Sequence, residues 1–350
     1  MTTNSITNPT PSFAAQTKSR NDGIDYLRGL LIALVIIGHV VVGSIHDNWV
    51  RYSIYAFHMP LFIGLTGYLL NPSTLKTAGW LDLGVNYWWR LIFPFAFAYV
   101  FFTGILTWHA FEEQRISAKL LLSYVHTPYY HLWFIPTLIL WLIAFRLILK
   151  TKFPLVLALT VTALVSLYWA SVPKDQQLAL LALITSKKVC YFFSFFLFGA
   201  WLRSDGSQRF RHVVGAYQKA IFVLSLVLGA IYLTQIGQAA NPLRGPTWWV
   251  MNVLLISLAI PWSQNLKLAS PSANNAQTPI NQALIGMGRQ SLPIYLWHVV
   301  PLFILKGLDV HQNQLTLYYL ISIFSSVLIV FLVLKFEGKS RWSNRVFYGG

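Results

Sequence analysis

The sequence predicts an all-α, polytopic membrane protein. Hydrophobic residues make up 56% of its 350 residues and charged residues only 10%, whereas a soluble domain has about 25% charged residues. The apolar residues fall in long runs, and a helix needs about 20 of them to cross the hydrocarbon core of a bilayer. This composition therefore predicts several membrane-spanning helices.

Apolar runs bounded by polar or Pro/Gly-rich breaks predict about ten transmembrane helices. They cover residues 24–45, 50–70, 88–108, 131–149, 153–172, 188–203, 217–235, 246–262, 290–307 and 314–335. An even number of helices places both termini on one side of the membrane. Most Lys and Arg residues lie in segments on that side, so we expect both termini to be cytoplasmic, in a multi-pass protein of the cell inner (cytoplasmic) membrane.

The chain predicts one transmembrane domain, over residues 22–337, because neither of the longest breaks, 109–130 and 263–289, has room for another. Residues 1–21 are polar and predict a disordered tail, and residues 338–350 predict a cytoplasmic C-terminal tail. The net charge of +16 comes from short loops between apolar runs. That placement indicates membrane topology and not nucleic-acid binding.

Few ionisable groups are left inside the apolar runs. All ten Asp and Glu residues lie in tails, in loops or near helix ends, which argues against an ion-coupled carrier and against paired-carboxylate hydrolysis. No HExxH motif or close His/Cys cluster occurs, so no metal is expected. Cys190 is the only cysteine and predicts no intramolecular disulfide. Histidine and arginine remain as the groups that could carry chemistry.

The first helix carries one residue of each kind. Arg28 and His39 are eleven residues apart, which places them on one helix face and about 16 Å apart in height. Asp25 precedes Arg28 in the opening turn, where it can offset the helix dipole or pair with the arginine. The spacing predicts that Arg28 and His39 line one pocket.

Three further segments combine a histidine with a proline: Phe57-His58-Met59-Pro60, His131-Leu132-Trp133-Phe134-Ile135-Pro136 and Ser291-Leu292-Pro293-Ile294-Tyr295-Leu296-Trp297-His298. Proline frees a backbone carbonyl, which membranes tolerate mainly beside protein or a watery cavity. These breaks predict an interior cavity.

The expected topology places three arginines, Arg28, Arg90 and Arg289, near the inner rim of the membrane. A guanidinium matches phosphate geometry, so these side chains suit the phosphates of a cytoplasmic anion such as a CoA thioester. Arg90 follows Trp88 and Trp89, and anchoring at the membrane interface is an alternative role for it and for Arg289.

The histidines are expected deeper, with His39 and His298 near mid-membrane and His58 and His131 in the outer half. A buried imidazole can act as a general base towards a hydroxyl. A hydrogen bond between helices is the alternative for each of them.

Four of these stretches, in this order, resemble the acyltransferase-3 family of integral-membrane acyltransferases, which includes O-acetylases of surface polysaccharides. The resemblance covers residues 22 to about 335. It rests on Asp25-Tyr26-Leu27-Arg28-Gly29 followed by His39, on Phe57-His58-Met59-Pro60-Leu61-Phe62 with Gly67-Tyr68, on His131-Leu132-Trp133-Phe134, and on Ser291-Leu292-Pro293-Ile294-Tyr295-Leu296-Trp297-His298.

The resemblance implies an acyl-CoA donor, a ten-helix domain and no permanently bound cofactor. The family's arginine with ten intervening residues before a histidine corresponds to Arg28 and His39, the expected catalytic residues. The expected donor-binding residues are Arg28, Arg90 and Arg289, and the acceptor or cavity candidates are Asp25, His58, His131, Trp133, Ser291 and His298. The chain departs from the family at Tyr87, where a second arginine is usual, so Arg289 or Lys76 is a candidate substitute.

The expected function is transfer of an acetyl or similar acyl group, such as succinyl, from acyl-CoA to a hydroxyl of a polysaccharide or a lipid-linked oligosaccharide. His39 acts as general base in direct transfer, and an acylated histidine intermediate is the alternative. A carrier or flippase for lipid-linked sugars, and a non-catalytic scaffold, are the alternative classes. The expected partners are acyl-CoA, a carbohydrate acceptor and the bilayer, with no nucleic acid.

Overall fold

The computed structural model describes residues 20–112, 117, 131–151, 154–172, 187–238, 241–266, 278–340 and 344–348. Within these ranges every regular element is a helix, which confirms the all-α prediction. The first half contains α1 (Asp22–Val40), α2 (Trp49–Leu69), α3 (Pro72–Thr77), α4 (Trp80–Tyr87), the π-helix η1 (Trp88–Ile92), α5 (Phe93–Glu112), α7 (Phe134–Lys150) and α8 (Leu155–Ser171).

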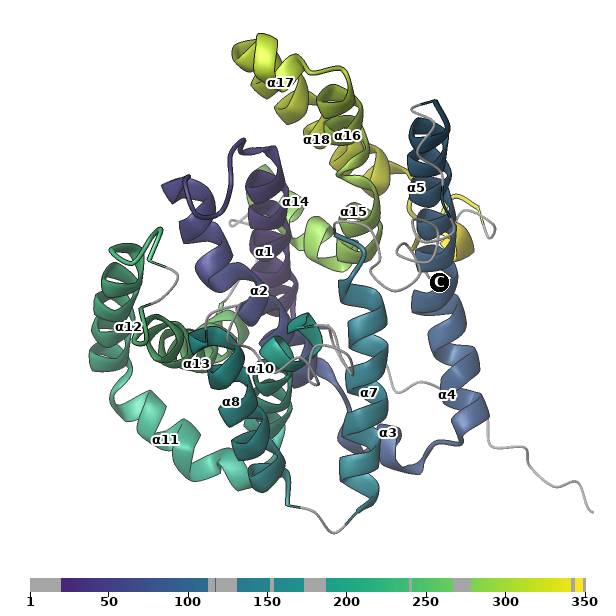
Figure 1. Cartoon of the computed structure of the whole chain (residues 1–350). Helices are drawn as coiled ribbons and strands as arrows, with labels where there is room; N and C mark the ends of the chain where they lie inside the picture. The colour runs from purple at the N-terminus through teal and green to yellow at the C-terminus, as the bar shows by residue number, and fades with distance from the viewer. Residues whose placement is uncertain are drawn as a thin grey trace, which may run out of the picture.

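The second half contains α10 (Lys187–Arg203), the 3₁₀ turn η3 (Asp205–Ser207), α11 (Gln208–Ala216), α12 (Gln218–Leu233), α13 (Arg244–Asn265), α14 (Pro279–Arg289), α15 (Ser291–Trp297), α16 (Val300–Gly307), α17 (Val310–Asn313), α18 (Leu315–Phe336) and the π-helix η4 (Asn344–Tyr348). In Figure 1 most of the long helices run roughly in one direction, with α1 and α2 near the middle. This arrangement is typical of a membrane bundle.

Three described helices are long and apolar enough to cross a membrane: Asp22–Val40, Trp80–Ile105 and Leu315–Phe336. A fourth span results if α11 with its preceding turn and α12, which are bent by 84° from each other, count as one. The count of ten transmembrane helices and the side on which the termini lie stay predictions.

The helices differ from the expected apolar runs in their ends and continuity. The run 88–108 begins earlier, at Trp80, because α4, η1 and α5 are continuous. The run 290–307 is divided into α15 and α16 by a turn at His298. These differences occur where a π-helical or broken segment interrupts regular helix, and apolar periodicity does not report such interruptions.

The expected terminal tails can be compared only in part. Residues 1–19 lie outside the described residues. In the C-terminal segment, Val346 is buried, Tyr348 Oη donates a hydrogen bond to the Val333 carbonyl at 2.6 Å, and the Phe347 ring lies 5.6 Å from that of Trp297. This part of the expected tail therefore packs against the helical domain.

The helix α1 is packed very closely against α14. A Cβ atom added to Gly29 would lie 1.9 Å from the Leu284 carbonyl oxygen, and one added to Gly288 would lie 1.8 Å from that of Asp25. The backbones of the two helices thus touch at glycine, as small residues allow between membrane helices. This contact fixes the height at which α14, and α15 after it, meet α1.

A second close approach joins α2 to α10. A Cβ at Gly67 would lie 2.0 Å from the Phe196 carbonyl oxygen, and one at Gly199 would lie 1.8 Å from that of Gly64. The glycine in the Gly67-Tyr68 motif is therefore required by packing.

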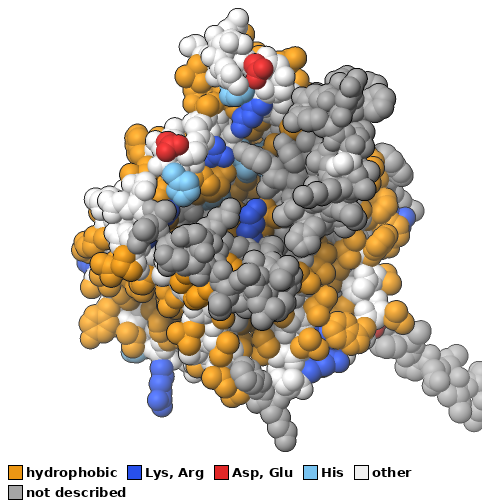
Figure 2. Space-filling model, in the orientation of Figure 1, with side chains coloured by type: hydrophobic (Ala, Val, Ile, Leu, Met, Phe, Trp, Pro, Cys, Tyr) orange, Lys and Arg blue, Asp and Glu red, His pale blue; other side chains and the backbone are white. Residues whose placement is uncertain are grey.

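The surface in Figure 2 carries hydrophobic side chains over a broad area, with Lys and Arg at its lower edge and in its central and upper parts. Many large apolar side chains of α5, α12 and α18 are exposed, for example Val100, Phe222 and Phe324. Exposed apolar surface of this extent is expected where lipid and not water surrounds a protein.

Replacing Gly288 with Ala is expected to destabilise the protein by about 1–3 kcal/mol, because a methyl group would overlap the backbone of α1. Thermal unfolding of the detergent-solubilised protein measures this effect. Gly84→Ala is the matched control, because nothing lies within 4 Å of a Cβ at that position. Equal unfolding temperatures for the two variants would contradict the role assigned to this contact.

Candidate active site

The start of α1 is fixed by a cap and by charge. The Asn21 side chain accepts a hydrogen bond from the Ile24 backbone N–H at 3.0 Å, and Asp22 and Asp25 occupy the first turn. Carboxylates there are stabilised by the positive end of the helix dipole. Helix α1 therefore begins at Asp22, and Arg28 lies about one turn beyond Asp25.

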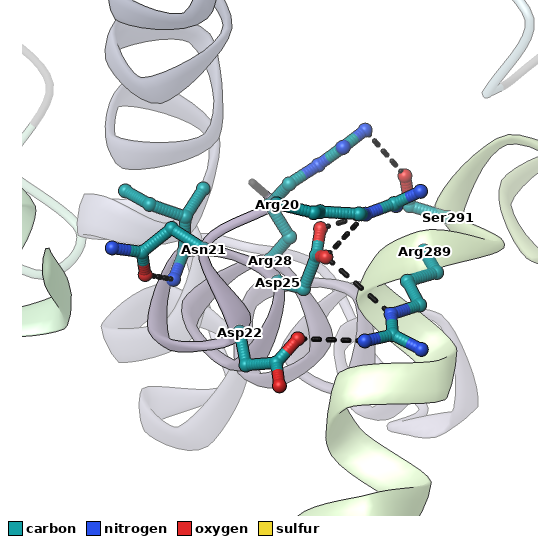
Figure 3. A network of polar contacts seen from close by, with 8 residues as sticks. Arg20, Asn21, Asp22, Asp25, Arg28, Arg289 and Ser291 are labelled. Carbon is teal, nitrogen blue, oxygen red and sulfur yellow. Dashed lines mark hydrogen bonds and ion pairs between the residues drawn. The ribbon is translucent and has the colours of Figure 1, made fainter. Parts of the chain in front are cut away.

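A polar network joins this first turn to α14 and α15 (Figure 3). The Asp25 side chain is 4% exposed. Its Oδ2 accepts a hydrogen bond from Arg20 Nε at 2.5 Å and lies 3.6 Å from Arg289 Nε. Arg289 also pairs with Asp22 at 2.6 Å. We call these residues, with Arg28 and Ser291, the rim network.

The expected pair of Asp25 with Arg28 is replaced by another arrangement. Asp25 is bound by Arg20 and Arg289, and Arg28 instead donates a hydrogen bond to Ser291 Oγ at 2.8 Å. The sequence spacing indicated a contact within one helix turn, but packing of α14 supplies a cation from 264 residues away. Arg28 is thereby left without a carboxylate in direct contact among the described residues.

The other predicted donor-binding arginines differ in their surroundings. Arg90 is exposed on the π-helix η1, and its charge acts on Arg28, as does that of Arg20. The structure therefore brings Arg90 into the electrostatic environment of Arg28. Arg289 is engaged by two carboxylates, which favours a structural role for it.

Three histidines from distant segments meet at the other end of α1. The ring centroids are 5.2 Å apart for His39 and His298, 5.6 Å for His131 and His298, and 6.4 Å for His39 and His131. We call these three residues the histidine cluster. Two of them, His131 and His298, come from the His/Pro segments, and the interior cavity that these segments predicted stays a prediction.

Hydrogen bonds to carbonyl groups determine the tautomers of two of these rings. His298 Nδ1 lies 2.9 Å from the carbonyl oxygens of Ile294 and Tyr295, and His131 Nε2 lies 3.1 Å from that of Leu296. Because a carbonyl only accepts, both nitrogens must carry the proton. The remaining nitrogens, His298 Nε2 and His131 Nδ1, are buried and have no hydrogen-bond partner among the described residues.

The turn after α15 makes these carbonyl groups accessible. The helix ends at Trp297 and resumes at Val300, so the carbonyls of Tyr295 and Leu296 lie where the regular i→i−4 pattern is interrupted. The carbonyls of Tyr295 and Leu296 then accept from imidazoles. Tyr295 Oη also donates to the His131 carbonyl. The broken helix therefore positions two of the three rings.

Two other predicted site residues, His58 and Trp133, differ in their relation to the cluster. His58 is buried on α2, with Nδ1 at 2.6 Å from the Ile54 carbonyl, and its ring is 4.9 Å from that of Tyr55, which is 6.3 Å from His39. Trp133 stacks on Phe192 at 5.6 Å, with Lys188 over its face at 4.8 Å. The Tyr55 ring therefore lies between His58 and His39 of the cluster, whereas the Trp133 ring packs against α10.

Sequence reasoning did not single out Tyr295 or Arg146. Arg146 is buried, donates hydrogen bonds to the carbonyls of Leu75 and Ala78 at 2.5 and 2.6 Å, and lies over the Trp80 ring. It attaches the segment before α4 to α7. Its position near the end of an apolar run concealed this role, since such an arginine is also typical of the membrane interface.

Within the described ranges, no group of three or more His, Cys, Asp or Glu side chains could hold a metal ion. The described site thus combines a cationic rim with imidazoles deeper in the bundle. Such a site can bind an anion at one end and move a proton at the other.

The family described as "Acyltransferase domain" (Acyl_transf_3) matches residues 21–335. The chain belongs to this acyltransferase-3 family.

Two similar relatives are both called nodulation protein NolL. The protein from Mesorhizobium japonicum is 35% identical over 106 residues, which cover 26% of this chain and 28% of the relative. The protein from Sinorhizobium fredii is 35% identical over 74 residues, which cover 19% of this chain and 20% of the relative. The matched segments thus span less than a third of either relative, and no solved structure matches the chain.

Replacing Asp25 with Asn is expected to lower stability by about 1–3 kcal/mol, because two guanidinium groups lose a buried charged partner. Asp22→Asn is the matched control, and it should cost less because the Asp22 side chain is 23% exposed and has one such partner. Thermal unfolding of both variants measures the difference. A larger loss for Asp22→Asn would contradict the central place of Asp25 in the rim network.

Proposed function

We propose that the protein is an O-acyltransferase of the cell inner membrane that transfers an acetyl or similar acyl group from acyl-CoA to a hydroxyl of a carbohydrate. The acceptor is a cell-surface polysaccharide or its lipid-linked precursor. The observation that carries the proposal is the convergence of His39, His131 and His298 on the helix that also presents Arg28. Family membership supports the reaction class.

The rim network suits the phosphate groups of the donor. Arg28 has a neutral partner, Ser291, so an incoming phosphate does not have to displace a carboxylate from it. Arg90 adds a second, exposed cation nearby. Guanidinium groups bind phosphates through paired hydrogen bonds, which supports this assignment.

The length of α1 assigns Arg28 and His39 different tasks. Eleven residues of helix separate their heights by about 16 Å, far more than the roughly 3 Å over which a donor can stabilise an oxyanion. Arg28 therefore binds the nucleotide end of acyl-CoA, and the pantetheine arm spans the distance to the histidine cluster. The oxyanion is stabilised by another donor near His39.

In the reaction, His39 accepts the proton of the acceptor hydroxyl as its oxygen attacks the thioester carbonyl. The C–S bond of the resulting tetrahedral intermediate breaks, and the CoA thiolate leaves and receives the proton. The unprotonated nitrogens of His131 and His298 provide a route for that proton. They are also where an acylated intermediate would form in a two-step transfer.

Replacing His39 with Ala is expected to reduce acyl transfer by at least about 100-fold, the usual contribution of general-base catalysis. Membranes containing each variant are incubated with labelled acetyl-CoA and the host's lipid-linked and polymeric glycans, and the glycans are analysed by mass. His46→Ala is the matched control, because His46 is exposed in the loop before α2.

Near-normal transfer by the His39 variant would remove this residue from the mechanism. Absence of transfer by the folded wild-type protein, together with movement of lipid-linked sugar in membranes devoid of acyl-CoA, would instead favour the carrier function.

Arg28→Lys is expected to raise the KM for acyl-CoA about tenfold with a smaller change in kcat, because a lysine loses the paired contact with phosphate. Arg289→Lys is the comparison, and it should mainly lower stability because Arg289 binds Asp22 and Asp25. Initial rates at varied acyl-CoA concentration separate the two effects. An unchanged KM in the Arg28 variant would contradict donor binding at the rim network.

A further inference from the structure

A second site of different character lies between α11, α12 and α13. It is a groove of about 680 Å³, within the roughly 300–1,000 Å³ typical of ligand pockets. No residue of the rim network or histidine cluster lines it. The groove is therefore separate from the site to which the acyltransferase function is assigned.

One part of the groove is apolar and exposed at the protein surface. Its wall includes Leu255 and Leu258 of α13 and Phe222 of α12, and Phe222 is 53% exposed. Hydrocarbon chains pack against such a surface without loss of hydrogen bonds. A ligand with an apolar chain therefore matches this wall.

The other part of the groove is cationic. Arg211 and Lys219 line it on either side of the bend between α11 and α12, with Gln218, Gln264 and Asn265 as further hydrogen-bond donors. Among its described lining residues there is no carboxylate, and neither cation forms an ion pair within the described ranges. The charge pattern is complementary to an anionic headgroup.

The orientation of α11 brings these two parts together. Phe210 packs against Trp201 and Phe198 of α10, with ring centroids at 5.3 and 5.9 Å, and Val214, one turn on, is also buried. The helix is bent by 84° from α12, and Figure 1 shows it running obliquely at the lower left of the bundle. A short helix with buried apolar residues and exposed basic ones is typical of a membrane interface.

We propose that this groove binds an anionic phospholipid of the surrounding bilayer. The lipid phosphate lies between Arg211 and Lys219, and an acyl chain follows the apolar wall of α12 and α13. A zwitterionic lipid offers no net charge to these cations, so the site selects for anionic headgroups.

The test measures phosphatidylglycerol retained by the purified full-length protein, by native mass spectrometry, against phosphatidylcholine. Arg211→Gln combined with Lys219→Gln is expected to reduce retained phosphatidylglycerol about tenfold, because each basic side chain near a lipid phosphate adds to the attraction. The matched control combines Arg209→Gln with Lys335→Gln, which removes the same charge from residues that do not line the groove.

Ala259→Phe tests the apolar part, because it adds a ring to the groove without changing charge. It should also reduce retention of phosphatidylglycerol. Variants are compared only as folded, monodisperse fractions.

Three outcomes would overturn the proposal. Equal losses in the paired variant and its control would indicate non-specific attraction to the basic surface. Displacement of the lipid by inorganic phosphate, with Ala259→Phe unaffected, would indicate a site for a soluble anion. Preferential retention of a polyprenyl diphosphate would indicate a site for a lipid-linked substrate. None of these readouts depends on acyl transfer, so the result is independent of the proposed function.

Discussion

The arrangement of the site depends on backbone contact between α1 and α14. Gly29 and Gly288 allow the two helices to touch, and a side chain at either position would overlap the opposite backbone. Because α15 follows α14 after a single residue, this contact also fixes where Ser291 and His298 lie along α1. Arg28 then meets Ser291, and His39 meets His298.

This one contact therefore sets both ends of the proposed donor site. A shift of α14 by one helix turn along α1 would move Ser291 about 5 Å from Arg28 and His298 by a similar distance from His39. The ion pairs of Asp25 and Asp22 with Arg289 oppose such a shift. The rim network thus acts together with glycine packing to maintain the register of the two helices.

Some of the site could be predicted from sequence because it depends on local geometry. The eleven-residue spacing of Arg28 and His39 determines their relative position on any straight helix. The partner of Asp25 could not be predicted this way, since Arg289 reaches it through tertiary packing. The role of Gly29 was also hidden, although it stands in the recognised motif, because a glycine in a helix gives no local sign of which backbone approaches it.

The histidine cluster shows a similar division between local and tertiary information. The prolines in the His/Pro segments predicted helix breaks beside a cavity. In the structure Pro60 lies inside the continuous helix α2, and Pro136 and Pro293 lie in the first turns of α7 and α15. The break beside the cluster instead falls at His298, at the end of its segment. The sequence did not indicate that the carbonyls at this break would orient the imidazoles.

That orientation has a chemical consequence. The carbonyl of Ile294 accepts both the backbone N–H and Nδ1 of His298, and the carbonyls of Tyr295 and Leu296 accept from Nδ1 of His298 and Nε2 of His131. A second N–H on either ring would be a buried donor without an acceptor among the described residues. These carbonyl contacts thus fix which nitrogen of each ring is free to take a proton beside His39.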